Sequence, residues 1–348
     1  MPIIEARDLT KQFRRPVKGP GLGGAIRHLF RPHHEDITAV DHIDLTIEVG
    51  ESVAYVGPNG AGKSTTVKLL TGILHPTAGD VRVCGIVPYQ DRIANARNIG
   101  VVFGQRTQLW WDIPVRESFR LLADIYEVPP REYERTITEL VDVLALEPLL
   151  PTPARQLSLG QRMRCDLAAA LIHSPPVLYL DEPTIGLDVA VKARFREFIR
   201  SMHQRRGLTV MLTSHDLGDT EELCERMVMI DRGSIVYDGA LEEIARRFGY
   251  EHALHIVLGR KLPNAAAVVR AAWDGRARSA RITQTDPTRL MVTFDARQVT
   301  SGELIHELAP HLPLADLRIE EPTAESIVRK LYEGTLTFDD REVEEGPS

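Results

Sequence analysis

The sequence is short of cysteine, of long apolar runs and of surplus positive charge, and each shortage excludes a class of protein. Its three cysteines (Cys84, Cys165 and Cys224) lie far apart and form no C-x-x-C pair, which argues against a disulfide framework or zinc site and favours a reducing cytosol. No stretch approaches the roughly 18 uncharged apolar residues of a membrane-spanning helix, and the N-terminus has no apolar signal-peptide core. The net charge of −7 offers no basic field for nucleic acid. Composition therefore indicates a globular protein of about two domains, whose role at a membrane would require a partner.

The stretch from Gly57 to Thr65 has the pattern of a phosphate-binding loop. Gly57 is followed, after four residues, by Gly62, Lys63 and Ser64, between a strand-like run and apolar residues at helical spacing. Glycines let successive backbone N–H groups point at one anion, and the following helix adds the partial charge of its N-terminus. We expect Lys63 to reach the β- and γ-phosphates of a nucleotide and the Ser64 hydroxyl to hold Mg²⁺.

Polar residues follow three apolar runs that read as strands of one parallel sheet. Asp181 and Glu182 follow one run, and Gln105 and His215 each follow another. The carboxyl edge of such a sheet is where ligands bind. We expect Asp181 to serve the metal, Glu182 to orient or deprotonate a water, Gln105 to sense Mg²⁺ or water, and His215 to contact a γ-phosphate.

Strand and helix patterns alternate through residue 240. Uninterrupted apolar runs such as Val177–Leu180 predict strands buried on both faces of a parallel sheet, and residues 115–150 predict two helices divided at Pro129-Pro130. Residues 14–38 mix arginine, glycine and proline and predict an irregular surface loop.

The pattern changes at about residue 250. Strand and helix signals follow the order β-α-β-β-α-β, which predicts a small α+β domain of ferredoxin-like type. A further helix is expected at 323–332, before an acidic tail that we expect to be disordered. The predicted domains are 1–240, 250–334 and a tail at 335–348.

These residues resemble the ATP-binding cassette (ABC) ATPases over roughly residues 3–240. The resemblance rests on motifs in the family order: the Walker A loop at 57–65, the Gln105 loop, the signature at 157–161, the Walker B run at 177–182, the Asp188 loop and the His215 switch. One departure is Leu159, which stands at the middle of the signature where the family usually has glycine, while Ser158 and Gly160 remain.

The resemblance implies an α/β fold with a mostly parallel core sheet, an antiparallel β lobe and a helical subdomain at about 106–165. It also implies a head-to-tail dimer of cassettes, in which each signature covers ATP held by the other subunit's Walker A loop, and Mg²⁺ held by Ser64, Gln105 and Asp181. The catalytic residues would be Glu182, His215 and Gln105. The residues expected to contact ATP are Phe13 (stacked on adenine), Gly57, Pro58, Asn59, Gly60, Ala61, Gly62, Lys63, Ser64, Thr65, Ser158, Gly160, Gln161 and Asp188.

Residues 104–112 and 157–164 resemble, more narrowly, a bacterial branch of drug and antibiotic exporters, some linked to viologen or anthracycline export. This resemblance implies an ATPase at the cytoplasmic face of the inner membrane, as a homodimer or heterodimer of cassettes. It would meet the membrane only through separate ABC-2-type permease subunits and would not bind nucleic acid. Trp110 and Trp111 lie in the region that meets the permease in this family, and we expect at least one of them to be exposed, since successive side chains of an extended loop diverge.

Three alternatives stay open at this point. An ABC importer ATPase is the closest rival, and the small C-terminal domain does not decide between them. A soluble cassette protein acting on ribosomes or DNA is disfavoured by the single cassette, the lack of heptads and the acidic balance. A GTPase or small kinase is disfavoured by the signature and by the absence of an Asn-Lys-x-Asp motif.

Overall fold

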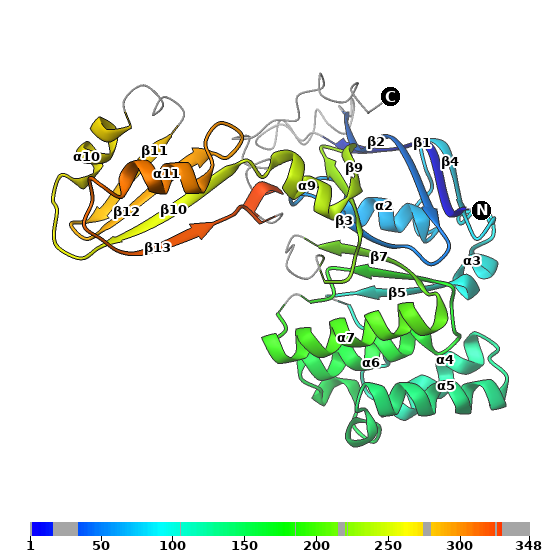
Figure 1. The fold of residues 1–348 in the computed structure, drawn as a ribbon. Helices are drawn as coiled ribbons and strands as arrows, with labels where there is room; N and C mark the ends of the chain where they lie inside the picture. The colour runs from blue at the N-terminus through cyan, green and yellow to red at the C-terminus, as the bar shows by residue number, and fades with distance from the viewer. Residues whose placement is uncertain are drawn as a thin grey trace, which may run out of the picture. The chain divides into compact units, whose positions relative to one another are not determined.

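The structure is a computed structural model that describes residues 2–16, 34–104, 106–184, 186–214, 220, 222–273, 280–323 and 326–328. The chain divides into two compact units, Met1–Gly239 and Ala240–Ser348 (Figure 1). Each unit is described by itself.

A six-stranded sheet forms the centre of the first unit. Its β5–β6, β6–β7, β3–β7 and β3–β8 pairings are parallel, as the unbroken apolar runs predict. The strands β3, β6 and β7 are buried almost end to end, which fits a sheet covered on both faces. In spatial order the strands are β5 (Ile99–Phe103), β6 (Val177–Asp181), β7 (Thr209–Ser214), β3 (Ser52–Val56), β8 (Arg226–Asp231) and β9 (Ser234–Ala240).

The antiparallel lobe is a three-stranded sheet in the order β2 (His34–Glu48), β1 (Pro2–Pro16) and β4 (Ala78–Val83). Its strands β1 and β2 stay paired as far as Pro16 and His34, with an ion pair between Arg14 and Asp36 at 3.5 Å. The expectation of an irregular loop over 14–38 was therefore wrong at both ends, because cross-strand pairing extends the hairpin. Residues 17–33 lie outside the described residues.

The helices of this unit begin and end close to the predicted positions. Helices α4 (Val115–Ile125) and α5 (Pro130–Val143) are separated at Pro129, as predicted. Both pack against α6, which lies on β5. The other helices whose full bounds lie among the described residues of this unit are α2 (Lys63–Leu70), α3 (Arg92–Asn98), α6 (Leu159–Leu171) and α7 (Val189–Arg206), with 3₁₀ turns at Glu147–Leu149 and Ala154–Gln156.

The second unit has the predicted β-α-β-β-α-β order. After α9 (Leu241–Phe248) it runs through β10 (Glu251–Leu258), α10 (Ala265–Ala272), β11 (Arg281–Asp286), β12 (Arg289–Asp295), α11 (Ser301–Leu308) and β13 (Leu314–Glu320). The sheet order is β11-β12-β10-β13 and all its pairings are antiparallel, so β12 lies between β10 and β11 as in a ferredoxin-like unit. Of the helix expected at 323–332, the structure describes 326–328 as helical, and the acidic tail lies outside the described residues.

Candidate functional site

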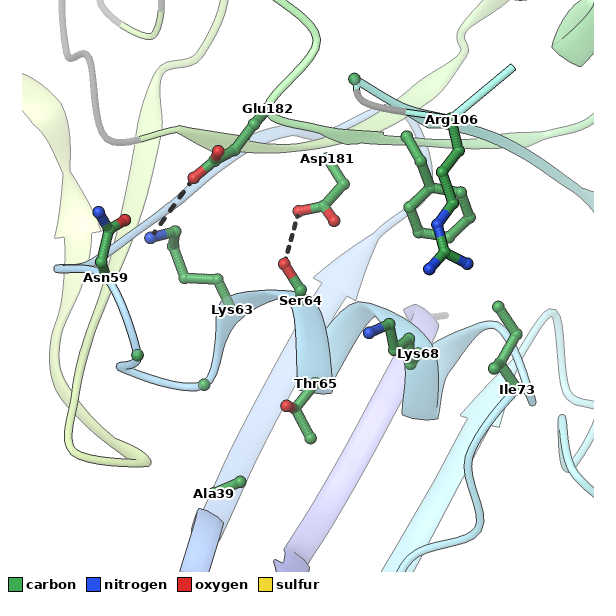
Figure 2. Close-up of a pocket in the computed structure, with 14 residues that line it drawn as sticks. Ala39, Asn59, Lys63, Ser64, Thr65, Lys68, Ile73, Arg106, Asp181 and Glu182 are labelled. Carbon is green, nitrogen blue, oxygen red and sulfur yellow. Dashed lines mark hydrogen bonds and ion pairs between the residues drawn. The ribbon is translucent and has the colours of Figure 1, made fainter. Parts of the chain in front are cut away.

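A cleft of about 490 Å³ opens where the loop after β3 and the start of α2 meet the ends of β5 and β6 (Figure 2). Four separate segments of the sequence build it. Its lining residues are Ala39, Asn59, Gly60, Gly62, Lys63, Ser64, Thr65, Lys68, Ile73, Phe103, Gly104, Arg106, Asp181 and Glu182.

The phosphate loop passes directly into α2 through Gly62. This residue has φ of 114° and is the N-cap of the helix, with no side chain capping the first turn. A Cβ at this position would lie 2.3 Å from the Ala39 carbonyl oxygen, so only glycine fits. The first N–H groups of α2 have no intrahelical partner and direct their partial positive charge at the loop.

Lys63 is the buried cation of the cleft. Its ammonium group donates to the carbonyl oxygens of Gly57 (2.7 Å) and Pro58 (3.3 Å) and lies 3.8 Å from a carboxylate oxygen of Glu182. Burial lowers the pKa of Lys63, and the nearby carboxylates of Glu182 and Asp181 oppose that shift. The lysine is thus held at the loop by backbone oxygens rather than reaching into solvent.

Asp181 ends β6 and joins two neighbouring elements through one carboxylate oxygen. The Ser64 hydroxyl donates to it at 3.2 Å and the Thr213 hydroxyl at 2.6 Å, so α2 and β7 both fix its orientation. Figure 2 shows Ser64 and Asp181 facing each other across the cleft. Hydroxyl and carboxylate oxygens gathered in this way are a donor set that suits Mg²⁺.

Glu182 follows in a backbone conformation that is unusual for a non-glycine residue, with φ of 51°. Its N–H lies 3.1 Å from the Thr213 carbonyl and 3.2 Å from the Thr213 hydroxyl, and these contacts hold the residue in place. Gly104 approaches so closely that a Cβ there would lie 2.2 Å from the Glu182 carbonyl oxygen. The turn separates the two adjacent carboxylates, because the Asp181 side chain meets Ser64 while that of Glu182 lies beside Lys63.

The predicted signature residues begin α6. Ser158 is the N-cap, its hydroxyl accepts the Gln161 N–H at 3.3 Å, and the Gln161 side chain accepts the Ser158 N–H at 2.9 Å. Gly160 lies against Val191, and the side chain of Leu159 lies 2.9 Å from the position a Cβ on Gly186 would take. Leu159 therefore packs over a glycine of the Asp188 loop.

Not every predicted site residue lies at the cleft. Ser158, Gly160 and Gln161 do not line it, and Asp188 caps α7 by accepting the Val191 N–H at 2.9 Å. Gly57, Pro58 and Ala61, which belong to the loop itself, do not line the cleft either, and neither does Phe13. Gln105 and His215 lie outside the described residues.

The Phe13 ring is 39% exposed on β1, opposite Ile37, with the ammonium of Lys11 at 5.3 Å from the ring centroid. An accessible aromatic ring in this position is compatible with stacking on a base.

Residues that the sequence did not single out also shape the cleft. Thr213 is fully buried and contacts both Asp181 and Glu182, yet a threonine at the end of an apolar strand carries no pattern that marks it. Lys68 and Arg106 line the cleft as further cations. Lys68 follows Ser64 by four residues on α2, a spacing that places both side chains on one face of the helix and is the one signal that could have indicated it.

A glycine loop at a helix N-terminus, a buried lysine, a serine–aspartate pair and a second carboxylate at the end of a parallel strand define a phosphate-loop nucleotide-binding protein. The family model described as ABC transporter matches residues 40–185. The ABC transporter ATP-binding protein NatA of Bacillus subtilis is 32% identical over 215 residues, which are 62% of this chain and 87% of that protein. The chain therefore belongs to the ABC transporter family, as an ATPase cassette.

Other relatives are longer than the matched region. One is ABC transporter A family member 1 of Dictyostelium discoideum, which is 31% identical over 73% of this chain. Another is the probable multidrug ABC transporter ATP-binding protein YbhF of Escherichia coli, which is 31% identical over 70% of this chain. The chain spans only 28% and 38% of their lengths.

Solved structures agree with the family assignment. An ATP-binding subunit of an ABC transporter superposes with a TM-score of 0.59 at 25% identity, covering 71% of this chain and 93% of that one. A dimeric ATP-binding cassette in a post-hydrolysis state with ADP and Pi superposes with a TM-score of 0.57 at 25% identity, covering 68% and 98%. Among the described residues, we find no helix with the length and apolar character needed to span a membrane.

Proposed function

We propose that this chain is the ATP-hydrolysing subunit of a bacterial exporter of drug-like or cationic compounds, working with separate ABC-2-type permease subunits at the cytoplasmic face of the inner membrane. The observation that carries the enzymatic part is the division of the two carboxylates, with Asp181 bonded to Ser64 and Glu182 beside Lys63. The export direction is supported by relatives named as multidrug and Nod factor export ATP-binding proteins, the latter of Burkholderia pseudomallei at 36% identity over 60% of this chain.

The cleft fits a nucleoside triphosphate with its metal. Ser64 and Asp181 would hold Mg²⁺, with Gln105 as a further ligand, and the metal when bound would offset charge on the β- and γ-phosphates. Lys63 and the N–H groups at the start of α2 would hold the phosphates themselves. Glu182 would take a proton from the attacking water, since its carboxylate lies outside the Ser64–Asp181 pair, and His215 would contact the γ-phosphate.

The signature residues take part only when two cassettes meet. Ser158, Gly160 and Gln161 do not line the cleft of their own chain, which supports a head-to-tail dimer in which they cover ATP held by the other cassette. Ser158 offers a hydroxyl at a helix N-terminus, which suits an anion. Phe13 would stack on adenine and Asp188 would lie at the same interface.

The first test separates nucleotide binding from turnover. Lys63→Ala should lose ATP binding, because the main cation of the loop is removed. Glu182→Gln should still bind ATP but hydrolyse it about 10²–10⁴-fold more slowly, which is the usual contribution of a general base, and should accumulate an ATP-bound dimer. Phosphate release and nucleotide binding measured on both variants would check this, and near-normal hydrolysis by Glu182→Gln would remove Glu182 from the mechanism.

The permease contact is tested at Trp110 and Trp111. Both are accessible, at 40% and 51% exposure, as the sequence predicts for at least one of them. Exposed aromatic residues commonly anchor protein partners. Replacing both with alanine should reduce co-purification with the permease and uncouple transport, while ATP binding and the melting temperature of the free subunit stay near the wild-type values. Unchanged co-purification together with a collapsed melting temperature would show that the pair only supports the fold.

A further inference from the structure

Strand β13 is an open edge of the sheet in the second unit. It lies last in the order β11-β12-β10-β13, where it pairs with β10 along one side, and no strand that the structure describes pairs with its other side (Figure 1). Most of its residues are exposed, and Ile319 is 44% exposed. An edge strand presents a row of N–H and C=O groups that can template pairing with another strand.

One hydrogen bond shows which backbone groups face outward. The Leu317 N–H donates to the Asp316 side chain of its own strand at 2.9 Å. In an antiparallel ladder the N–H and C=O of a residue face the same neighbour, and successive residues alternate. The backbone N–H and C=O of Leu317 therefore face the free edge, and so do those of Ile319. Alternation stops at Ala315, because the ladder shifts register between Val257 and Leu258 and leaves Ala315 without a partner in β10.

We propose that β13 pairs antiparallel with β13 of a second copy of this chain, about a twofold axis at Leu317. The pairing joins the two four-stranded sheets into one continuous sheet. Leu317 faces Leu317 of the second copy as a hydrogen-bonded pair, and Asp316 and Arg318 flank it on both sides of the axis. The contact is separate from the nucleotide-bound interface of the cassettes and does not depend on ATP.

Charge fixes the register of this pairing. With the axis at Leu317, Asp316 of each copy lies opposite Arg318 of the other, and both side chains are exposed. Moving the axis to Asp316 or to Arg318 places two like charges directly opposite each other, which destabilises a strand pair. Arg318 has no ion pair with any residue in the described part of the chain, so it is available for this contact.

The other edge of the same sheet lacks this complementarity. Strand β11 carries Arg281 at one end and Asp286 at the other. When a twofold axis perpendicular to the sheet relates two antiparallel strands, residues that lie opposite each other differ in number by an even count. Arg281 and Asp286 differ by 5. No such axis brings them together, so β11 offers no matching charges to a second copy.

Side-chain packing supports the same partner. Leu317 and Ile319 lie opposite Ile256 and Leu254 of β10, whose side chains belong to the buried face of the sheet. The pairing sets the Leu317 side chains of the two copies beside each other at this face. Apolar surface is therefore covered at the axis of the contact.

The first experiment measures self-association of the full-length chain without nucleotide by sedimentation equilibrium. The variants are Asp316→Arg, Arg318→Asp and the double reversal. Each single reversal turns two attractive pairs into two repulsive ones and should raise the dissociation constant about ten- to a hundredfold. The double reversal should restore association, and equal melting temperatures of all variants would show that folding is unaffected.

The second measurement traps the contact by oxidation. Residues 316 and 318 of the two copies form a non-hydrogen-bonded pair with Cα atoms about 4.5 Å apart, within reach of a disulfide. A mixture of Asp316→Cys and Arg318→Cys chains should crosslink, whereas each variant alone serves as the control, since its cysteines lie diagonally at about 7–8 Å. A chain that stays monomeric at every concentration, as it would if its own residues covered β13, would overturn the proposal. Single reversals without effect, or a mixture that crosslinks no better than the controls, would also overturn it.

Discussion

Replacing Thr213 with valine should slow ATP hydrolysis without abolishing nucleotide binding. The Thr213 hydroxyl donates to Asp181 at 2.6 Å and lies 3.2 Å from the Glu182 N–H, so one group orients both carboxylate residues. Valine has nearly the same shape but no hydroxyl. The Glu182 N–H keeps the Thr213 carbonyl as its acceptor at 3.1 Å, so the main loss is the bond to the Asp181 carboxylate.

The size of the effect follows from that bond. A hydrogen bond to a charged group contributes about 1.5–3 kcal/mol, and the side chain is fully buried, so water does not replace it. If the loss is expressed mainly at the transition state, kcat falls about ten- to a hundredfold. Nucleotide affinity should change much less, because in the proposed binding mode Lys63 and the loop hold the phosphates without Thr213.

The assay compares phosphate release with ATP binding, beside a chemical denaturation curve for each variant. Thr213→Ser is the matched control, because it keeps the hydroxyl and loses a methyl group at a cost of about 1 kcal/mol in stability. It should retain most of the hydrolysis. Valine and serine variants that hydrolyse ATP at equal rates would refute the reasoning.

Two further predictions test the surroundings of the site. Gly104→Ala should reduce hydrolysis at least about tenfold and destabilise the fold by about 1–3 kcal/mol, because its Cβ would lie 2.2 Å from the Glu182 carbonyl oxygen. Phosphate release and thermal melting measure the two effects. Gly302→Ala is the control, because its Cβ would have no atom within 4 Å. Burial raises the pKa of Asp166 to about 6, so the stability it contributes is complete below its unfolded pKa of about 4 and is lost as pH rises through about 6. Asp166→Asn should remove this decline from denaturation curves recorded across that range, and an unchanged decline would contradict the assignment.

The parts of the fold that the sequence predicted are those with a local physical signature. The glycines of the phosphate loop, the unbroken apolar run of β6 and the split between α4 and α5 at Pro129 each carry their signal within a few residues. The order of elements in the second unit followed from periodicity in the same way.

The parts that the sequence did not predict depend on contacts between distant residues. The extension of the β1–β2 hairpin rests on pairs such as Arg14 with Asp36, which neither residue indicates alone. Thr213 became recognisable only when β7 was placed beside β6, where its hydroxyl meets Asp181. Gly104 likewise has a reason to be glycine only once the Glu182 carbonyl lies against it.

The cap of α6 has a consequence for which side chains position 158 can accept. A serine hydroxyl has two lone pairs and one hydrogen, and here a lone pair accepts the Gln161 N–H. The hydroxyl hydrogen remains able to point outward. The same hydroxyl can therefore cap the N-terminus of α6 and donate to a phosphate in the proposed dimer. Aspartate would cap the helix equally well but would bring a negative charge and no hydrogen. Helix stability alone would tolerate serine or aspartate at position 158. Only donation of a hydrogen bond to a phosphate requires serine.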